Sequence, residues 1–501
     1  MKTIIKSLVL VSIIALSTAC QKDFLEVDPI GKLTIEKFYN TDEDANRAVI
    51  AAYDILQWMN ARDWNSAYLV KTFPSDESNV GGGDAGDQPP YQELGIFNYG
   101  PSNATITAVW QSNYFGVYRA NQVINNVKPE TDFRKRIIAE AKFLRAYYYF
   151  EIASMFGNGP LNLTDLTPSE YSQPFVNASA IYAQVAKDLT EAIPDLPLKS
   201  QYAQEDKFRA SKGAAQALLG KCYLYDKKYS ESAAAFEDVI NSNEFDLQQD
   251  FSTLFLQASE FGVESVFEVS WVTEMGYDWG TFQWGGNRAM ENNITWQLTG
   301  PRGDYFQPGN TGLIGGWGFN YPKQSLYDAF VAAGDTKRKV ASVMSLEDLR
   351  AQGGDWTNES SWGWDGCIRV KYGTRLDETA GPVNELNYGT NLRLIRFADV
   401  LLMAAEANHL AGNDGKATTY LNRVRLRAEL PDFSGDILTA IKKERELELC
   451  FEGVRFLDLI RWGDAPAVLG SAGFVAGKHE VFPIPQAEMR NNSKAVQNNG
   501  Y

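Results

Sequence analysis

The sequence predicts a mostly α-helical protein, in which a scaffold of tetratricopeptide-like helical pairs carries an irregular insert rich in Trp and Gly. Apolar residues recur at helical spacing through most of the first half and again near the C-terminus. Small and aromatic residues follow the order of a tetratricopeptide repeat. Between 257 and 390 the pattern changes to Gly, Trp, Asn and short alternating runs, which indicate strands and loops.

Composition limits the function before any motif is considered. The chain has 501 residues, of which 44% are hydrophobic and 22% are charged, as in an ordinary globular protein with a large core. The formal net charge is 47 − 63 = −16 and no Lys/Arg cluster occurs, so nucleic acid is not an expected ligand. The only histidines are His409 and His479, so neither a metal site nor a cofactor is predicted.

The first residues have the pattern of a secretory signal. Lys2 and Lys6 precede an apolar stretch over 8–16 that is too short to span a bilayer. Small residues then lead to Cys20, the predicted lipid acceptor of a bacterial lipoprotein, although Ser17 stands where such motifs usually carry an aliphatic residue. A cleavable signal with an incidental cysteine is the alternative. Residues 1–19 are thus predicted to be a signal peptide, and 20–41 a polar tether.

Helical patterns begin after the tether. Thr41 and Asp44 form a capping box before a helix that starts at Ala45 and runs to Trp58. Later helices are expected over 104–127, 132–156, 178–193, 211–226, 229–242, 393–411, 414–428 and 435–461. These patterns divide the chain into an N-terminal helical region over 42–256, an insert over 257–390 and a C-terminal region over 391–501.

One helical pair carries the repeat pattern best. Leu219, Gly220 and Tyr223 are followed by Ser232, Phe236 and Val239, which fits the tetratricopeptide positions. A looser copy begins at Ala404 and continues through Ala417, Leu421 and Val424, and a third is split between 139–157 and 178–193. Small residues at these places let paired helices approach closely, but a repeat scaffold by itself names no function.

Several local motifs are given structural interpretations. Gly81 to Gly86 satisfy GxGxxG, but a polar stretch precedes them and Pro89-Pro90 follow, so a surface loop is expected rather than a dinucleotide site. Cys222 and Cys450 lie in apolar helical patterns and are expected to be buried thiols, with a disulfide as the alternative. His409 is expected near a helix C-terminus.

The charge-rich string AIKKERELELCFEGVRFLDLIRW alternates sign at helical spacing and predicts a helix end held by ion pairs. No local motif indicates the pair of carboxylates that glycoside hydrolysis requires.

Tryptophan is unevenly distributed. Eight of the 12 tryptophans fall between 271 and 364, among Gly, Asn and Asp. Flat aromatic faces beside amides and carboxylates suit sugar rings, whose C–H faces stack while their hydroxyls form hydrogen bonds. The alternative is that the Trp residues form small local hydrophobic cores within Gly-rich loops. The clustering favours at least one ligand contact in this region.

Distinctive strings occur along nearly the whole chain. They include QKDFLEVDPIGKLTIEKFYNTDEDANRAVIAAYDIL after Cys20, then AEAKFLRAYYYFEIASMFGNGPL, RASKGAAQALLGKCYLY and GWGFNYPKQSLYDAF. They continue with LRLIRFADVLLMAAEAN, ERELELCFEGVRFLDLIRWG and VFPIPQAEMRNNSKAVQNNGY. Together these strings resemble the SusD/RagB family of outer-membrane nutrient-binding lipoproteins. Gln21-Lys22-Asp23 also resembles the signal that sends such lipoproteins to the outer face of the outer membrane.

The resemblance implies a non-catalytic role and a partner. Such proteins cap a SusC-like TonB-dependent transporter in Bacteroidetes and deliver captured glycan to it, whereas the RagB branch handles peptides. The resemblance therefore implies a lipid anchor at Cys20, a location on the cell exterior and a glycan ligand. A peptide-capturing lid and, less favoured, a surface glycoside hydrolase are the alternatives.

Family ligand sites lie on variable loops facing the transporter, and two stretches here match in position: 75–99 and the Trp-rich insert. In the first, Asp76 and Asp84 are expected to accept hydrogen bonds from hydroxyls, Asn98 to act as a bidentate amide and Tyr91 to stack. In the insert, the expected platforms are Trp284, Trp296 and Trp362, with Arg288 and Asn292 as polar neighbours. An extended 362–364 would point Trp362 and Trp364 the same way as one wide platform, whereas Trp317 is expected to be structural.

Overall fold

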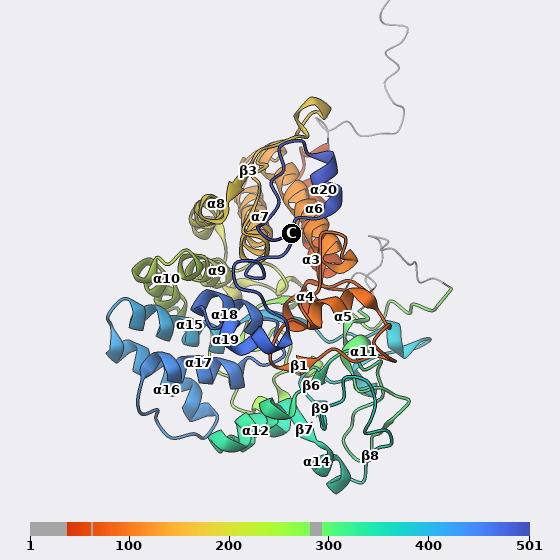
Figure 1. The fold of residues 1–501 in the computed structure, drawn as a ribbon. Coiled ribbons are helices and arrows are strands. Elements are labelled where there is room, and N and C mark those ends of the chain that lie inside the picture. Colours follow the sequence, from red (N-terminus) through yellow and green to blue (C-terminus); the bar gives the residue numbers. More distant parts are fainter. Residues whose placement is uncertain (1–37, 62–63, 281–292) are drawn as a thin grey trace, which may run out of the picture.

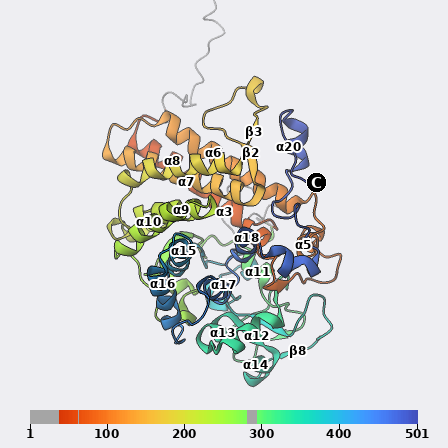
Figure 2. The same ribbon diagram turned by 60° about the vertical axis from the view of Figure 1, so that its left-hand side comes forward.

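Helices stacked side by side form one half of the molecule, and the insert forms the other. The computed structural model describes residues 38–61, 64–280 and 293–501. Figure 1 shows α6, α7 and α8 at one end, α9, α10, α15 and α16 along one side, and the green insert with α12 and α14 at the opposite end. Figure 2 shows the same helices layered from α8 to α17. The expectation of a mostly helical scaffold with an irregular insert is confirmed.

Capping residues set where the long N-terminal helices begin. These helices are α3 (Asp42–Ala61), α6 (Ala104–Asn126), α7 (Asp132–Phe156) and α8 (Ala178–Ala192). The side chains of Asn103, Thr131 and Asn177 accept hydrogen bonds from the first-turn N–H groups of α6, α7 and α8. Helix α7 ends at Gly157, which adopts φ +72°. Shorter helices α4 (Ala67–Thr72) and α5 (Pro89–Gly95) follow α3.

The helical pairs predicted from the repeat pattern are present. Helix α9 (Lys212–Tyr225) packs on α10 (Tyr229–Asn241), and α15 (Phe397–Leu410) packs on α16 (Asp414–Arg427). Ser232 Oγ donates to the Gly220 carbonyl at 2.8 Å. A Cβ on Gly220 would come within 2.7 Å of the Phe236 ring, so the absence of a side chain lets this pair close.

Two predicted helices need correction at the C-terminal side. The pattern over 393–411 begins as a strand, β10 (Leu392–Arg396), because these residues pair with β4 (Ser265–Val269) before α15 starts. The pattern over 435–461 divides into α17 (Ile437–Glu448) and α18 (Arg455–Trp462). Between them Phe451 and Gly453 adopt positive φ, which a continuous helix cannot accommodate. Helices α19 (Ala465–Leu469) and α20 (Gln486–Asn491) complete the chain.

The two ends of the insert meet at an antiparallel strand pair. Strands β4 and β10 lie near its two ends and pair with each other, so the insert leaves and rejoins the scaffold at one place. Its helices are α11 (Thr295–Thr299), α12 (Gln324–Ala333), α13 (Thr336–Ser342) and α14 (Leu346–Ala351). Its other strands are β5 (Phe306–Gln307), β6 (Tyr321–Pro322), β7 (Val343–Ser345), β8 (Asp355–Trp356) and β9 (Cys367–Arg369). Outside the insert lie β1 (Ser78–Asn79), β2 (Asn158–Pro160) and β3 (Phe175–Asn177).

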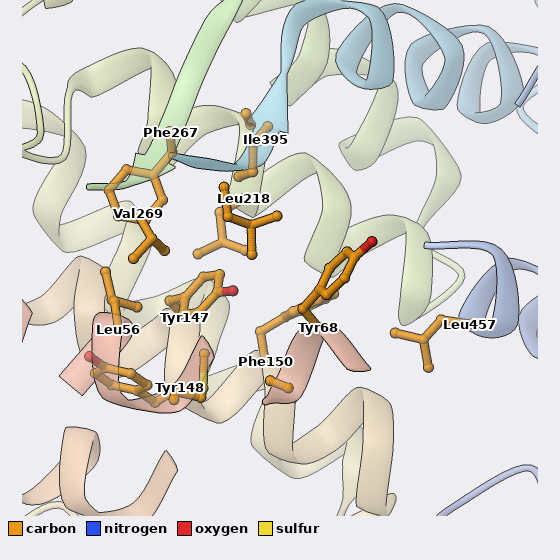
Figure 3. Packing of buried hydrophobic residues seen from close by; sticks show 14 of the residues in the cluster. Leu56, Tyr68, Tyr147, Tyr148, Phe150, Leu218, Phe267, Val269, Ile395 and Leu457 are labelled. Carbon is orange, nitrogen blue, oxygen red and sulfur yellow. The ribbon is translucent and has the colours of Figure 1, made fainter. Parts of the chain in front are cut away.

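The main core lies between the N-terminal helices and the β4–β10 pair. Figure 3 shows Tyr147 of α7 facing Leu218 of α9 and Val269 of β4, with Tyr68 of α4 beside them. Two smaller apolar clusters lie within and under the insert, one around Trp356 and one around Phe330. The first cluster lies wholly within the insert, and the second joins the insert to Leu447, Cys450 and Phe451 of the C-terminal region.

A buried ionic cluster ties the insert to the C-terminal helices. Glu448 accepts hydrogen bonds from Arg338 at 2.8 Å and Arg396 at 2.5 Å, and from Arg427. These guanidinium groups hold the pKa of Glu448 well below its usual range despite its burial. The ion-paired interpretation of the charge-rich string is thus confirmed.

Smaller structural predictions also hold. Cys222, Cys367 and Cys450 are buried free thiols. His409 lies in the last turn of α15, where Nδ1 is 2.8 Å from Asp414 Oδ1. Among the described residues, no helix is both long and apolar enough to cross a membrane.

Candidate functional site

Three segments that are distant in the sequence meet at one surface beside α5 and α11. Strands β1 and β6 pair there. The Gly82 N–H donates to the Gly318 carbonyl at 2.9 Å, and Gly82 adopts φ +108° against the Phe319 ring, where a Cβ would come within 2.6 Å. Asn79 Nδ2 donates to the Gly363 carbonyl at 3.3 Å. The two stretches expected to form the site, 75–99 and the insert, therefore contact each other directly.

Three tryptophans stack in offset steps at this surface. The rings of Trp64 and Trp317 lie 4.8 Å apart at 19°, and those of Trp317 and Trp279 lie 6.3 Å apart at 17°. Trp279 is 44% exposed, while Trp64 and Trp317 are half-buried. Because the rings are nearly parallel and offset, the set presents aromatic surface in successive steps. We call Trp64, Trp279 and Trp317 the tryptophan stack.

Buried aromatic residues hold the inner end of the tryptophan stack. The Tyr91 hydroxyl donates to the Trp64 carbonyl, and Phe319 meets the Trp64 ring edge to face at 6.2 Å. Tyr91 in turn packs against Phe319 at 5.3 Å and against Phe73 at 5.0 Å. These contacts fix the backbone that carries Trp64 and so pre-organise the stack.

Charged groups border the stack. Arg302 donates to Asp304 Oδ2 at 2.8 Å and to the Trp317 carbonyl at 3.4 Å. Asp87 Oδ2 lies 4.0 Å from Arg302 and accepts the Gly83 N–H at 2.8 Å. The border thus combines paired charges with backbone groups, so it adds polar contacts without a strong excess of either sign.

Trp362 lies against the other side of the Gly-rich loop over 81–86, which we call the Gly81 loop. Its Nε1 donates to Gln92 Oε1 at 3.1 Å, while 45% of the side chain stays exposed. Gln92 also donates to the Gly81 carbonyl at 2.8 Å. The same loop is therefore held between Trp362 and the segment that carries the tryptophan stack.

This arrangement is suited to ligand binding. Exposed aromatic faces beside hydrogen-bonding groups bind ligands that have both apolar faces and hydroxyl groups. Within the described ranges, no group of three or more His, Cys, Asp or Glu side chains could hold a metal ion.

Comparison with known proteins identifies the family. Residues 337–476 match the model described as "SusD family", and residues 23–224 match the model described as "Starch-binding associating with outer membrane". A solved structure titled "Laminarin binding SusD-like protein" is 33% identical, with a TM-score of 0.84 over 92% of this chain and 100% of that one. The chain belongs to the SusD family.

Other relatives of this SusD-family protein also match along nearly their whole length. SusD-like protein P38 of Formosa agariphila is 26% identical over 99% of this chain and 98% of its own. A surface glycan-binding protein A from Bacteroides thetaiotaomicron, solved in complex with laminarihexaose, is 27% identical with a TM-score of 0.78, covering 92% and 100% of the two chains. The two solved structures are titled for binding laminarin or surface glycan, in agreement with the expected non-catalytic role.

Two of the aromatic residues predicted to stack on ligand are buried in the SusD-family fold. Trp296 is 1% exposed; its ring stacks on Tyr372 at 4.4 Å and 3°, and its Nε1 donates to the Thr390 carbonyl at 2.8 Å. Tyr91 is equally buried and supports Trp64 instead. The expectation that these two rings face a ligand is therefore wrong, because neighbouring residues already cover them.

The expected wide platform of Trp362 and Trp364 is also wrong. Residues 361–364 form a turn, in which the Trp364 N–H donates to the Ser361 carbonyl at 3.2 Å. The turn sends the two rings to different environments. Trp362 is exposed, whereas Trp364 stacks on Trp356 at 4.0 Å and 4° within the smaller core.

The polar residues predicted in 75–99 have three different settings. Asp76 forms a two-pronged ion pair with Arg455 at 2.8 and 2.7 Å, which lowers the pKa of its carboxyl and makes it structural rather than a ligand acceptor. Asp84 is exposed on the Gly-rich loop, where it accepts the Gly86 N–H at 2.7 Å. Asn98 is exposed beyond the end of α5, next to Phe97, which packs on the C-terminal segment.

The remaining predicted residues, Cys20, Trp284, Arg288 and Asn292, lie outside the described residues.

Sequence reasoning missed the main feature of the surface. Trp64 lies far from the tryptophan-rich stretch in sequence, and Trp317 was expected to be structural. Trp279 was counted within the cluster but was not singled out. One signal was available: Trp64 stands among polar residues in NARDWNSAY, outside the apolar spacing of α3.

Proposed function

We propose that this protein captures a neutral glycan of the laminarin type on the tryptophan stack, without cleaving it. The stacked rings of Trp64, Trp317 and Trp279 at the surface are the observation that carries the proposal. Two relatives whose titles name laminarin or laminarihexaose support the choice of ligand class. The net charge of −16 also favours a neutral polymer over an acidic one.

In this proposal sugar rings stack on the exposed indole surface while nearby polar groups bind hydroxyls. Trp362 and Asp84 are the predicted residues that keep an exposed position beside the same loop. Trp284, Arg288 and Asn292 stay predictions. An open surface covers only part of each sugar, so we expect a Kd between micromolar and millimolar, on the order of 4–8 kcal/mol of binding free energy.

Capture would serve transport at the cell surface. The signal-like sequence before Cys20 supports a lipid anchor there, and the family model described as associating with the outer membrane supports that location. The resemblance of strings along the chain to SusD-family lipoproteins supports a SusC-like TonB-dependent transporter as the partner. In this arrangement the protein delivers bound glycan to the transporter.

The test uses the protein beginning after Cys20, wild type and Trp279→Ala/Trp317→Ala. Both are run on native affinity gels containing laminarin, other neutral polysaccharides or none, and released reducing sugar is assayed in the same samples. We expect laminarin to retard the wild type, the double variant to bind roughly tenfold to a hundredfold more weakly, and no sugar to be released.

Leu426→Ala, an exposed change on α16, is the matched control and should bind as the wild type does. Retardation that the double variant retains would contradict the role of the tryptophan stack. Binding of peptides but of no polysaccharide would favour a peptide-capturing lid instead, and released sugar would overturn the non-catalytic role.

A further inference from the structure

A second aromatic groove lies at the other end of the scaffold. It is formed by α6, the segment that follows β2 and the helix α20. Both views place α6, β3 and α20 together, away from α11 (Figures 1 and 2). Two cavities of about 580 Å³ and about 260 Å³ share Tyr114, Tyr118, Asn162 and Tyr171 in their walls, and together they make one groove. We call it the α6 groove.

Aromatic rings follow the groove at regular spacing. Trp110, Tyr114 and Tyr118 are four residues apart on α6, so they lie along one face with a rise of roughly 6 Å per step. The rings of Trp110 and Tyr114 lie 4.8 Å apart. Tyr118 and Tyr171, which are 54% and 62% exposed, stand in the walls from two different segments. The informative feature is that both exposed rings stand in the walls of one groove and so form a shared apolar patch that a ligand can contact.

The wall of the groove also contains Asn162, whose backbone is held in place and whose side-chain oxygen has no hydrogen-bond partner in the described part of the chain. The backbone of Asn162 is held by three hydrogen bonds: its N–H donates to the Tyr149 hydroxyl at 2.7 Å, and its carbonyl accepts from Tyr149 at 2.7 Å and from Asn121 at 2.9 Å. Its side-chain Oδ1 is buried and has no hydrogen-bond partner among the described residues. A buried acceptor of this kind is costly unless a ligand or water donates to it.

The walls of the groove carry one guanidinium and two carboxylates. Arg119 and Glu488 line the larger cavity, where Glu488 Oε1 accepts from Asn492 at 2.9 Å. Asp165 lines the smaller cavity. The groove as a whole thus has one negative charge in excess, which disfavours an anionic ligand.

We propose that the α6 groove is a second ligand site, specific for a neutral oligosaccharide. Aromatic rings along one helix face, the Asn162 side chain and the absence of any excess positive charge match a ligand with apolar faces, hydroxyl groups and no negative charge. The volume lies within the range of small-ligand pockets and accommodates more than one sugar ring. The site shares no residue with the tryptophan stack, so the proposal does not depend on the function proposed above.

The test is calorimetric titration of the protein beginning after Cys20 with laminarihexaose, cellohexaose, maltohexaose and xylohexaose. Four proteins are compared: the wild type, Tyr118→Ala/Tyr171→Ala, Trp279→Ala/Trp317→Ala and the combination of both pairs. We expect one of these sugars to bind the tryptophan variant normally and the tyrosine variant about tenfold or more weakly. The combined variant should bind none of them.

Folding is not at issue, because Tyr118 and Tyr171 are exposed, and an unchanged melting temperature verifies this. Asn162→Asp provides a second perturbation. It keeps Oδ1 but replaces the amide nitrogen with a charged oxygen, and it should weaken binding of the same sugar. If the tyrosine variant binds every sugar as the wild type does, or if the wild type binds none of them, the proposal is overturned. A co-purifying protein lost only from the tyrosine variant would assign the groove to a protein contact and would also overturn it.

Discussion

Tryptophans of the same insert have opposite settings in the core and at the surface. Trp296 lies flat on Tyr372, with Arg369 5.6 Å from its ring and its Nε1 bound to a carbonyl. Trp279 and Trp317 stack on each other with aromatic surface left exposed. The difference lies in burial: neighbouring residues cover Trp296 on its faces and edge, whereas Trp279 keeps 44% of its side chain exposed. We therefore expect the first setting to control stability and the second to control binding.

The largest expected effect is from Trp296→Ala. Removing this buried ring leaves a cavity beside Tyr372 and Tyr68, which should lower the free energy of unfolding by about 3–5 kcal/mol. Urea denaturation measures this loss. The glycan affinity of the folded fraction should stay within about twofold, which is near 0.4 kcal/mol. If Trp296→Ala had normal stability but lost glycan binding, the division between a buried tryptophan that controls stability and surface tryptophans that control binding would be wrong.

The stability of the core around Trp296 should also depend on pH. Burial, and then the neighbouring Asp76 charge, raises the pKa of Glu77 from 4.5 to about 8. Glu77 accepts the Phe451 N–H, and the carbonyl of Phe451 accepts from Tyr68 beside Trp296. Because the folded pKa is raised, the protonated group stabilises the fold fully below about pH 4.5, and this contribution is lost as the pH rises through about 8.

Between pH 6.5 and 8 we expect Glu77 to remove about 2 kcal/mol of stability. Glu260, whose pKa burial also raises to about 8, should remove a similar amount. Glu77→Gln should therefore reduce the pH dependence of the unfolding free energy, whereas glycan affinity at 20 °C should not change over this interval. An unchanged slope in the variant would show that Glu77 is already ionised in the folded protein.

A smaller effect is expected at Tyr91, a buried residue that supports the exposed tryptophan stack. Tyr91→Phe removes the hydroxyl that donates to the Trp64 carbonyl, which should cost about 1 kcal/mol of stability and weaken glycan binding a few-fold because Trp64 is less firmly held. Tyr148→Phe is the matched control, since its hydroxyl donates to the Ala52 carbonyl inside the helical scaffold. It should lose similar stability with no change in affinity, and equal affinities for the two variants would contradict the supporting role of Tyr91.

These contrasts show what the sequence could predict. Helix positions followed from apolar spacing and, for the first helix, from the Thr41 and Asp44 capping box, because both signals are local. The position of β10 did not, since Leu392–Arg396 becomes a strand only by pairing with residues more than 120 positions earlier. The same limit applies to the tryptophans. Composition indicated an aromatic site in the insert, but burial of Trp296 depends on Tyr372 and Thr390, which no local pattern reveals.

The smallest expected effect concerns the outer step of the tryptophan stack. Trp279→Ala removes the most exposed of the three rings, but it uncovers the face of Trp317 that lay 6.3 Å away and nearly parallel to it. The ligand can then stack on the next ring, so affinity should fall only about twofold to fivefold, under about 1 kcal/mol. Titration with laminarihexaose measures this change beside the Trp279→Ala/Trp317→Ala variant. A single substitution as damaging as the double one would mean that Trp279 alone carries the ligand and that the stack does not act in successive steps.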